Sequence, residues 1–294
     1  MVPSIAFAVE ANAGSDIAVR AESQAADDLI RPVVRQRRER TRAHAVVARF
    51  IGPVVLLAGW WVASATGILA PDLLASPNAV AKATGQLWGD GQLSAALFVS
   101  LGRAGAGLAL GVIAGLILGL VAGSSRLGDD LVDSTMQTVR AIPFLSLVPL
   151  FMVWFGIGES ARVILIAVAT TFPMYVATSG AVRNADPKLL EAARVFGLSR
   201  AETIRRVVIP GALPALFSGL RLATTLSVIA LIAAEEINST SGLGYLMSMA
   251  QNFSRTDILT VCILIYGLLG LVADSAIRLI ERFSMPWLVG RAAA

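Results

Sequence analysis

Six long apolar segments fill most of this chain and leave it little choice of environment. A helix needs about 20 apolar residues to cross the hydrocarbon core of a bilayer. The uncharged cores of the six segments cover residues 50–70, 104–125, 141–158, 163–182, 222–234 and 258–273. The fifth is long enough only if it begins near Gly211 and includes Arg221, and the sixth must run past Asp274. With 56% hydrophobic and 15% charged residues, the chain is too apolar for a soluble domain. We predict an all-α membrane protein with six transmembrane helices.

The positions of the basic residues predict the orientation, because short basic loops stay in the cytoplasm. A cluster of arginines precedes the first apolar segment: Arg31, Arg35, Arg37, Arg38, Arg40, Arg42 and Arg49. Counting six crossings from a cytoplasmic start places most later basic residues on the same side: Arg126, Arg140, Arg183, Lys188, Arg194, Arg200, Arg205, Arg206, Arg278, Arg282 and Arg291. Only Lys82, Arg103, Arg162 and Arg255 fall outside. We therefore expect both termini in the cytoplasm.

The two ends of the chain differ from the apolar middle, residues 50–285. Residues 1–28 are rich in Ala, Ser, Asp and Glu without sustained periodicity, which predicts disorder in a cytoplasmic tail covering residues 1–49. Its basic part, residues 31–49, either lies on anionic lipid headgroups or only sets the orientation. Residues 286–294 are expected to form a second cytoplasmic tail. The pI near 9.8 thus reflects membrane orientation and gives no support for nucleic-acid binding.

A charged, amphipathic insert at residues 186–210 separates the fourth and fifth apolar segments. Its pattern predicts a helix, a glycine turn and a second helix. Pro187 suits a first helical turn, and Gly197 suits the left-handed residue that closes a helix. Ser199 and Glu202 have capping-box spacing, and Pro210 is expected to end the second helix. Apolar residues recur at helical spacing in the first helix: Leu189, Leu190, Ala193 and Phe196.

The insert, within residues 183–212, resembles the EAA loop of the permease subunits of ATP-binding-cassette (ABC) importers. The resemblance rests on Glu191-Ala192-Ala193, on Gly197 four residues later, and on Ile209-Pro210. It implies a cytoplasmic helix that docks on a separate ATPase subunit. The coupling residues it implies are Glu191, Ala192, Ala193, Gly197, Leu198 and Pro210. The alternative interpretation is an ordinary amphipathic hairpin on a membrane protein.

The resemblance extends from about residue 52 to residue 287. Four segments look like the sulfonate, taurine and nitrate branch of importer permeases: SLVPLFMVWFGIGESARV (146–163), NADPKLLEAARVFGLS (184–199), VIPGALPALFSGLRLA (208–223) and AEEINSTSGLGYLM (234–247). LVDSTMQTVRAIP (131–143) and ILIYGLLGLVADSAIRLIER (263–282) look most like aliphatic-sulfonate permeases.

This resemblance implies a type I importer permease in a bacterial cytoplasmic (inner) membrane. It also implies a homodimer in contact with membrane lipid, two ATPase subunits that bind ATP and Mg, and an extracytoplasmic substrate-binding protein. An aliphatic sulfonate is the expected substrate. Taurine, nitrate, bicarbonate and pyrimidine precursors remain alternatives, and the substrate-binding residues remain unknown.

The sequence lacks the residues that most catalytic sites require. Cys262 is the only cysteine and His44 the only histidine, which excludes cysteine metal clusters and histidine triads. Neither Lys82 nor Lys188 follows a phosphate-binding loop. We expect no catalytic residue, no metal site and no cofactor in this chain, so ATP hydrolysis must come from another one.

An ion-coupled secondary transporter is the rival function. Such proteins place ionisable groups within the membrane, and the candidates here are Arg221, Asp274, Glu235 and Glu236. Snorkelling of Arg221 and a local pair between Asp274 and Arg278 explain these charges more simply.

Three further patterns concern packing and the translocation path. Glycines recur every four residues in the second apolar segment, which predicts a close helix contact rather than a sliding surface: Gly107, Gly111, Gly115, Gly119 and Gly123. Pro143 and Pro149 are expected to interrupt the third span, and Pro173 to kink the fourth. Met152, Trp154 and Phe155 are candidates for an apolar gate. An anionic substrate is compatible with Arg103, Arg162 and Arg255 near the outer face, whereas Glu235 and Glu236 would oppose it, so these charges do not decide the substrate.

Overall fold

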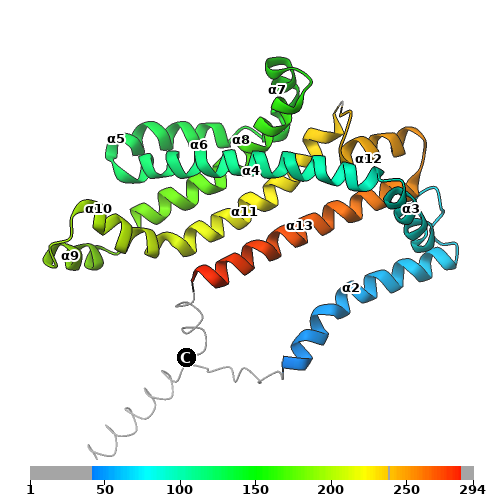
Figure 1. Cartoon of the computed structure of the whole chain (residues 1–294), viewed down its shortest axis with the longest axis horizontal. Coiled ribbons are helices and arrows are strands. Elements are labelled where there is room, and N and C mark those ends of the chain that lie inside the picture. The colour runs from blue at the N-terminus through cyan, green and yellow to red at the C-terminus, as the bar shows by residue number, and fades with distance from the viewer. Residues whose placement is uncertain (1–41, 238, 286–294) are drawn as a thin grey trace, which may run out of the picture. The chain divides into compact units, whose positions relative to one another are not determined.

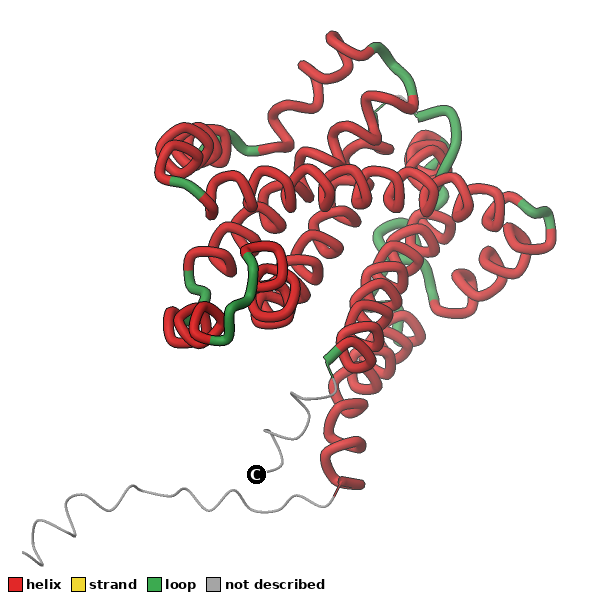
Figure 2. The backbone as a smooth tube through the Cα atoms, turned by 60° about the vertical axis from the view of Figure 1, so that its left-hand side comes forward, coloured by secondary structure: helices red, strands yellow, loops and turns green. Residues whose placement is uncertain are grey.

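A computed structural model of the chain describes residues 42–237 and 239–285 (Figure 1). All regular structure in these residues is helical, and short loops join the helices (Figure 2). The predicted C-terminal tail and most of the predicted N-terminal tail lie outside the described residues. The chain divides into two compact units, residues 1–59 and 60–294. In the first unit, the described residues belong to helix α2 (Arg42–Ala65), which contains Pro53 and continues to Ala65 in the second unit.

Four helices are long and apolar enough to cross a membrane. They are α4 (Gln92–Ser124), α8 (Glu159–Arg183), the continuous helix Ala201–Glu236, and α13 (Thr256–Ser284). A bent pair of helices counts as a fifth span if it is taken as one. The predicted first span corresponds to a shorter apolar helix, Ile51–Ala65, in the described part of the chain. The described residues therefore hold four or five spans by length and composition, where the sequence predicts six.

The bent pair replaces the predicted third span at residues 141–158. Its first arm, Arg126–Arg140, comprises α5 (Arg126–Gly128), η1 (Asp129–Asp133) and α6 (Ser134–Arg140). Its second arm, Phe144–Phe155, comprises η2 (Phe144–Leu147) and α7 (Val148–Phe155) and is bent from the first by 84°. Pro143 lies at the break, as expected for a residue without a backbone N–H. The prediction for Pro149 was wrong, because it lies in the first turn of α7, where proline is well tolerated.

The second helix of the charged insert does not end at Pro210, so that prediction was also wrong. Helix α10 (Arg200–Thr203) passes through a π-helical turn, η3 (Ile204–Val208), into α11 (Ile209–Glu236). Pro210 then lies in the first turn of α11, and the wider π turn accommodates the missing donor. The result is a single helical rod of 36 residues, Ala201–Glu236.

Three short helices complete the second unit. Helix α3 (Pro77–Gly89) begins at Ser76, whose hydroxyl accepts a hydrogen bond from the Ala79 N–H. Helix α9 (Pro187–Val195) lies between α8 and α10, and α12 (Leu243–Asn252) lies between α11 and α13. We call the end of the bundle that carries α9 and α10 the α9 end, and the opposite end, with α12 and α3, the α12 end (Figure 1).

Helices α4 and α8 run parallel and pack closely along the glycine stripe of α4. The glycines face successive turns of α8 at a constant sequence offset, and their partners are Ile166, Thr170, Met174, Thr178 and Val182. A Cβ atom added to Gly115 would lie 2.6 Å from the Thr171 carbonyl oxygen and 2.7 Å from the Met174 Cβ. Such distances leave no room for any side chain but hydrogen, so the two backbones are in direct contact. On the other side of α8, Gly219 of α11 faces Ala177 in the same way.

Many large apolar side chains point away from the bundle. Examples are Leu110, Ile113 and Ile117 on α4, and Leu268 and Leu271 on α13, all exposed. A soluble protein would bury such a surface, whereas lipid tails cover it in a membrane. The larger of two apolar core clusters in the described residues lies at the α12 end, where α3, α4, α11, α12 and α13 meet around residues such as Leu93, Leu231 and Leu243.

Candidate functional site

Both ends of helix α9 are capped by residues next to it in the sequence. Asp186 caps its start, since its carboxylate accepts a hydrogen bond from the Lys188 N–H at 2.9 Å. Gly197 follows its end with a φ of 71°, a conformation that side chains other than hydrogen resist. The Gly197 N–H donates to the Arg194 carbonyl and the Leu198 N–H to the Ala193 carbonyl, both at 3.0 Å. These bonds satisfy carbonyls that the helix end would otherwise leave unpaired.

The capping box predicted at the start of the next helix is formed. The Ser199 N–H donates to Glu202 Oε2 at 3.0 Å, and the Glu202 N–H donates to the Ser199 hydroxyl at 3.3 Å. The helix, glycine turn and second helix expected from the sequence are therefore present, although the second helix continues into α11.

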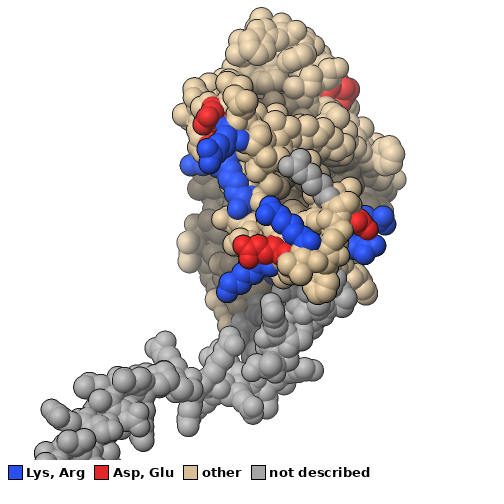
Figure 3. All heavy atoms as spheres, turned by 90° about the vertical axis from the view of Figure 1, so that its left-hand side faces the viewer, with Lys and Arg blue, Asp and Glu red and all other residues tan. Residues whose placement is uncertain are grey.

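This helix-turn-helix exposes large apolar side chains. Ala193 is 4% exposed and anchors α9, whereas Val195 and Phe196 are 85% and 81% exposed. Leu189 is also exposed, as are Glu191, Ala192 and Gly197, and Leu198 is half-buried. Basic and acidic side chains are exposed on the face of the molecule at the α9 end (Figure 3). Exposed apolar residues with a charged rim are typical of a protein interaction surface.

Partly exposed ion pairs connect helices at the α9 end. The Arg183 guanidinium at the end of α8 pairs with Asp129 and lies 3.6 Å from Asp133, both on η1. The Tyr175 hydroxyl donates to Asp133 at 2.5 Å. These contacts join α8 to the first arm of the bent pair.

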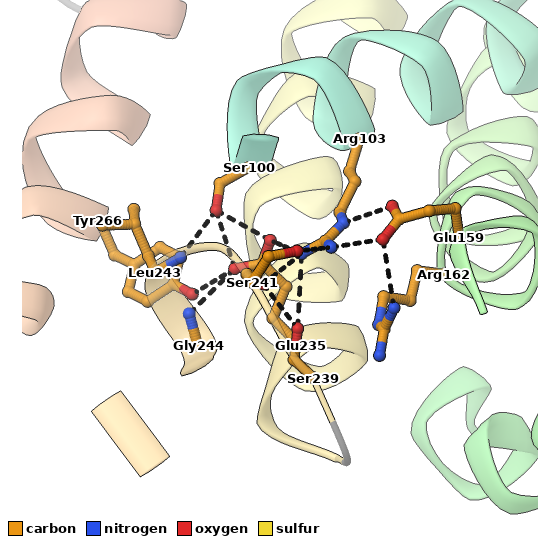
Figure 4. A network of polar contacts seen from close by, with 10 residues as sticks. All are labelled: Ser100, Arg103, Glu159, Arg162, Glu235, Ser239, Ser241, Leu243, Gly244 and Tyr266. Atoms are coloured by element: carbon orange, nitrogen blue, oxygen red, sulfur yellow. Dashed lines mark hydrogen bonds and ion pairs between the residues drawn. The ribbon is translucent and has the colours of Figure 1, made fainter. Parts of the chain in front are cut away.

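A second polar cluster, which we call the Arg103 network, is buried near the α12 end (Figure 4). Arg103 of α4 is 3% exposed and donates to Glu159 of α8 through Nε and Nη2, at 2.6 and 2.5 Å. Its Nη1 donates to Glu235 of α11 at 2.6 Å and to the Ser241 carbonyl at 2.8 Å. One guanidinium thus joins three spans and the loop that follows α11.

Glu235 is fully buried, and its carboxylate has a complete set of donors. Ser100 donates to it at 2.7 Å, Tyr266 of α13 at 2.9 Å and the Gly244 N–H at 3.0 Å, in addition to Arg103. Gly244 must lack a side chain, because an added Cβ would collide with Glu235. A buried charge is tolerated only when it is paired and hydrogen-bonded, and both conditions hold here.

The sequence places Arg103 and Arg162 near the outer face and leaves open whether they or Glu235 would influence an anionic substrate. In the structure, Arg103 and Glu235 neutralise each other, and Arg162, 2% exposed, lies 3.3 Å from Glu159. Arg255 pairs with Asp257 at 2.8 Å, which raises the pKa of its guanidinium. Ser100 and Arg103 are polar residues in an otherwise apolar helix, which could have indicated a buried polar contact. No sequence pattern, however, identifies Glu235 as their partner, because it lies more than 130 residues further along the chain.

Two further charges proposed for an ion-coupled mechanism, Arg221 and Asp274, are also paired, whereas Glu236 is exposed and forms no ion pair with a described residue. Asp274 and Arg278 form the local pair expected from their spacing, at 2.7 Å. Arg221 does not need snorkelling, because it pairs with Glu281 and lies 3.6 Å from Asp274 on α13. Among the described residues, no group of three or more His, Cys, Asp or Glu side chains could hold a metal ion.

Two cavities lie along α8. The first, about 390 Å³, lies between the bent pair, α8 and α11 and is lined mainly by apolar residues, including Phe144 and Leu147. The second, about 780 Å³, lies between α8 and α11 and reaches Arg221 and Asp274. Met152, Trp154 and Phe155 lie on α7, and none of the three lines either cavity.

Arg140 is placed differently from the prediction. Crossing counts put it with the cytoplasmic loops, but it lies 5.5 Å above the ring of Phe172, near the middle of α8. The reason is the break at Pro143, which ends the first arm of the bent pair halfway along the bundle.

Comparisons with known proteins agree with this architecture. Residues 111–284 match the family described as binding-protein-dependent transport system inner membrane component. A protein of Escherichia coli K12 named as an aliphatic sulfonates transport permease, SsuC, is 43% identical over 82% of this chain and 92% of its own length. The SsuC of Bacillus subtilis 168 is 35% identical over 80% of this chain and 85% of its own. The taurine transport system permease TauC of E. coli K12 is 31% identical over 79% and 86%.

Solved structures share the fold at lower identity. A chain of the MetNI methionine ABC transporter has a TM-score of 0.51 at 18% identity and covers 67% of this chain and 98% of that chain. A chain of an amino acid ABC transporter has a TM-score of 0.54 at 21% identity and covers 68% and 97%. The family match over more than half of the sequence, with relatives of this identity and coverage, shows that the chain belongs to the binding-protein-dependent transport system inner membrane components, the permease subunits of ABC importers.

Proposed function

We propose that this chain, as a homodimer, forms the membrane passage of an importer for aliphatic sulfonates. Two separate ATPase subunits, which bind ATP and Mg, drive it, and an extracytoplasmic binding protein delivers the substrate. The observation that carries the substrate assignment is the 43% identity to a relative named for aliphatic sulfonates, with a second such relative at 35%. Taurine remains the nearest alternative, because TauC is 31% identical.

Helix α9 is the proposed ATPase contact, through Glu191, Ala192, Ala193, Gly197 and Leu198. Its exposed apolar residues, Val195 and Phe196 above all, can enter a groove on a partner, while buried Ala193 fixes the helix to the permease. The Schellman-type turn at Gly197 makes α9 a rigid lever rather than a flexible loop.

The continuous helix Ala201–Glu236 can transmit movement of α9 across the membrane. It starts two residues after Ser199 and, at a rise of 1.5 Å per residue, spans about 54 Å. Its far end carries Glu235, which the Arg103 network ties to α4, α8 and α13. Movement of α9 is thus transmitted to the α12 end, where a binding protein would dock.

Charge supports a cytoplasmic α9 end, and with it a cytoplasmic location of both termini. That end holds Arg126, Arg183, Lys188, Arg194, Arg205 and Arg206. The loops at the α12 end hold few basic residues, and Arg255 there is neutralised by Asp257. This distribution follows the positive-inside rule.

Transport by reconstituted vesicles tests the proposal. Vesicles would contain the purified permease, its candidate ATPase and the binding protein, and uptake of a radiolabelled alkanesulfonate would be followed. We expect uptake only when ATP reaches the ATPase side, and most of it should persist after proton and sodium gradients are collapsed. Gradient-driven uptake by the permease alone would overturn the proposal in favour of the secondary transporter.

The ligands of the binding protein separate the substrate alternatives. Calorimetric titration of the isolated binding protein with an alkanesulfonate, taurine, nitrate, bicarbonate and a pyrimidine precursor would rank them. Tightest binding of the alkanesulfonate is expected. Tightest binding of any other ligand would replace the sulfonate assignment and leave the permease assignment unchanged.

A further inference from the structure

The two cavities along α8 adjoin each other and share three lining residues, Arg140, Phe172 and Leu226. Phe172 lies near the middle of α8, so the shared wall lies about halfway between the α9 and α12 ends. We call the two cavities together the central chamber. Each cavity falls within the range of about 300–1,000 Å³ that is usual for small-molecule sites.

Arg140 is the feature of the central chamber that calls for a ligand. Four other arginines within the described spans have carboxylate partners: Arg103, Arg162, Arg183 and Arg221. Arg126, Arg205 and Arg282 form no ion pair with a described residue, but they lie near the ends of their helices. Arg140 forms no ion pair with any residue that the structure describes, and its guanidinium lies 5.5 Å from the centre of the Phe172 ring. A charged side chain at this depth is costly, and such residues usually mark a substrate path.

The surroundings of Arg140 match a short anion with an apolar tail. The guanidinium offers a planar fork of donors suited to an oxyanion. The first cavity adds apolar and aromatic surface from Met136, Phe144 and Leu147. The second adds the hydroxyl residues Ser218 and Thr225. Its one carboxylate, Asp274, is held by Arg221 and Arg278 and so does not repel an anion with its full charge.

We propose that the central chamber is a substrate site of the permease itself, in which Arg140 binds the sulfonate group and the first cavity holds the alkyl chain. Phe172 positions Arg140 through the cation–π contact and covers the carbon next to sulfur. This site rests on the proposed function, since the occupant is the transported sulfonate.

Binding to the purified permease–ATPase complex, without binding protein, tests the site. Equilibrium binding of a radiolabelled alkanesulfonate would be compared in the wild type, Arg140→Gln, Arg140→Lys and Arg126→Gln. Arg126→Gln is the matched control, because Arg126 lies at the start of α5 and lines neither cavity. We expect Arg140→Gln to weaken binding by about 10-fold or more, the usual effect of losing a charge-assisted hydrogen bond. Arg140→Lys should lose less, because it keeps the charge but not the fork.

A second measurement reports occupancy without the arginine variants. Leu226→Cys, in a Cys262→Ala background, would place a single thiol in the shared wall of the chamber. An alkanesulfonate should slow its modification by a maleimide, whereas an alkyltrimethylammonium of equal length should not. Ser254→Cys, in the loop between α12 and α13, is the control and should react at one rate throughout. Protection by added anionic lipid but not by sulfonate would assign the chamber to a headgroup and overturn the proposal.

The failures of the site and of the proposed function are distinguishable. If the complete wild-type transporter takes up no sulfonate, the proposed function fails and the site fails with it. If it takes up sulfonate while Arg140→Gln matches Arg126→Gln in binding and in the KM for uptake, and Leu226→Cys is not protected, the function stands and the site is wrong.

Discussion

The Arg103 guanidinium of α4 donates a hydrogen bond of 2.6 Å to the Glu235 carboxylate of α11. Both residues are buried, with Arg103 3% and Glu235 0% exposed. An ion pair so deeply buried adds little stability over a well-packed apolar pair, but breaking it leaves a charge without compensation. The contact therefore fixes which helices meet at the α12 end, and its removal should be costly.

Arg103→Met should lower the free energy of unfolding by about 3–5 kcal/mol, because Glu235 loses the one cation that pairs with it among the described residues. The double variant Arg103→Met, Glu235→Gln should recover part of that loss. Cys262, the single cysteine, is fully buried, so a thiol-reactive dye reports unfolding directly. Arg255→Met, which breaks a largely exposed pair, should cost less than about 1 kcal/mol. Equal losses for Arg103→Met and Arg255→Met would contradict this account.

Gly115→Leu should separate α4 from α8 and destabilise the bundle by at least about 1–3 kcal/mol. The reason is the direct backbone contact with Thr171 and Met174. Leu110→Ile on the exposed face of α4 is the matched control and should change little. Melting in detergent and retention of the proposed homodimer on size-exclusion chromatography would compare the two. If Gly115→Leu melted and eluted like the wild type, the contact between α4 and α8 would have to be loose at this position.

Gly197→Val should distort the end of α9, because a β-branched residue resists a φ of 71°. The expected outcome is a folded permease that binds the ATPase weakly or hydrolyses ATP without transport. Gly211→Ala is the control, since its Cβ would meet no atom within 4 Å and its φ is ordinary. Co-purification and coupled uptake would be measured for both. Normal assembly and uptake by Gly197→Val would remove α9 from the coupling mechanism.

Phe196→Asp should weaken ATPase binding by about 10-fold or more while leaving permease stability almost unchanged, because the side chain is 81% exposed. Phe253→Asp changes a similarly exposed ring at the α12 end and should leave ATPase binding intact. Surface plasmon resonance with the purified ATPase would give both affinities. Indistinguishable affinities would show that the ATPase binds elsewhere.

Local structure was predictable where neighbouring residues determine it. The caps at Asp186, Gly197 and Ser199 all involve bonds within five residues, so spacing alone sufficed for them. The end of the following helix was not predictable in this way, because a π turn absorbs Pro210. The broken third span likewise depends on how Pro143 is accommodated, which a count of apolar residues does not reveal.

Long-range partners were less accessible to sequence reasoning. The glycine stripe predicts a close neighbour for α4 but cannot say that it is α8. Arg103 and Glu235 each look like an isolated charge until the fold brings them together. Arg140 was assigned to the wrong depth because counting assumed a straight third span.

The constant offset between the glycines of α4 and their partners on α8 limits how the permease can move. If one helix slid along the other, every glycine from Gly107 to Gly123 would lose its contact with α8 at the same time. We therefore expect α4 and α8 to move as one rigid body, so that a conformational change occurs in the helices and loops next to them. The π-helical turns η1 and η3 both lie near the α9 end, and π turns often mark places where a helix can change shape. The chain is therefore stiffest along the α4–α8 contact and most adaptable beside the proposed ATPase contact.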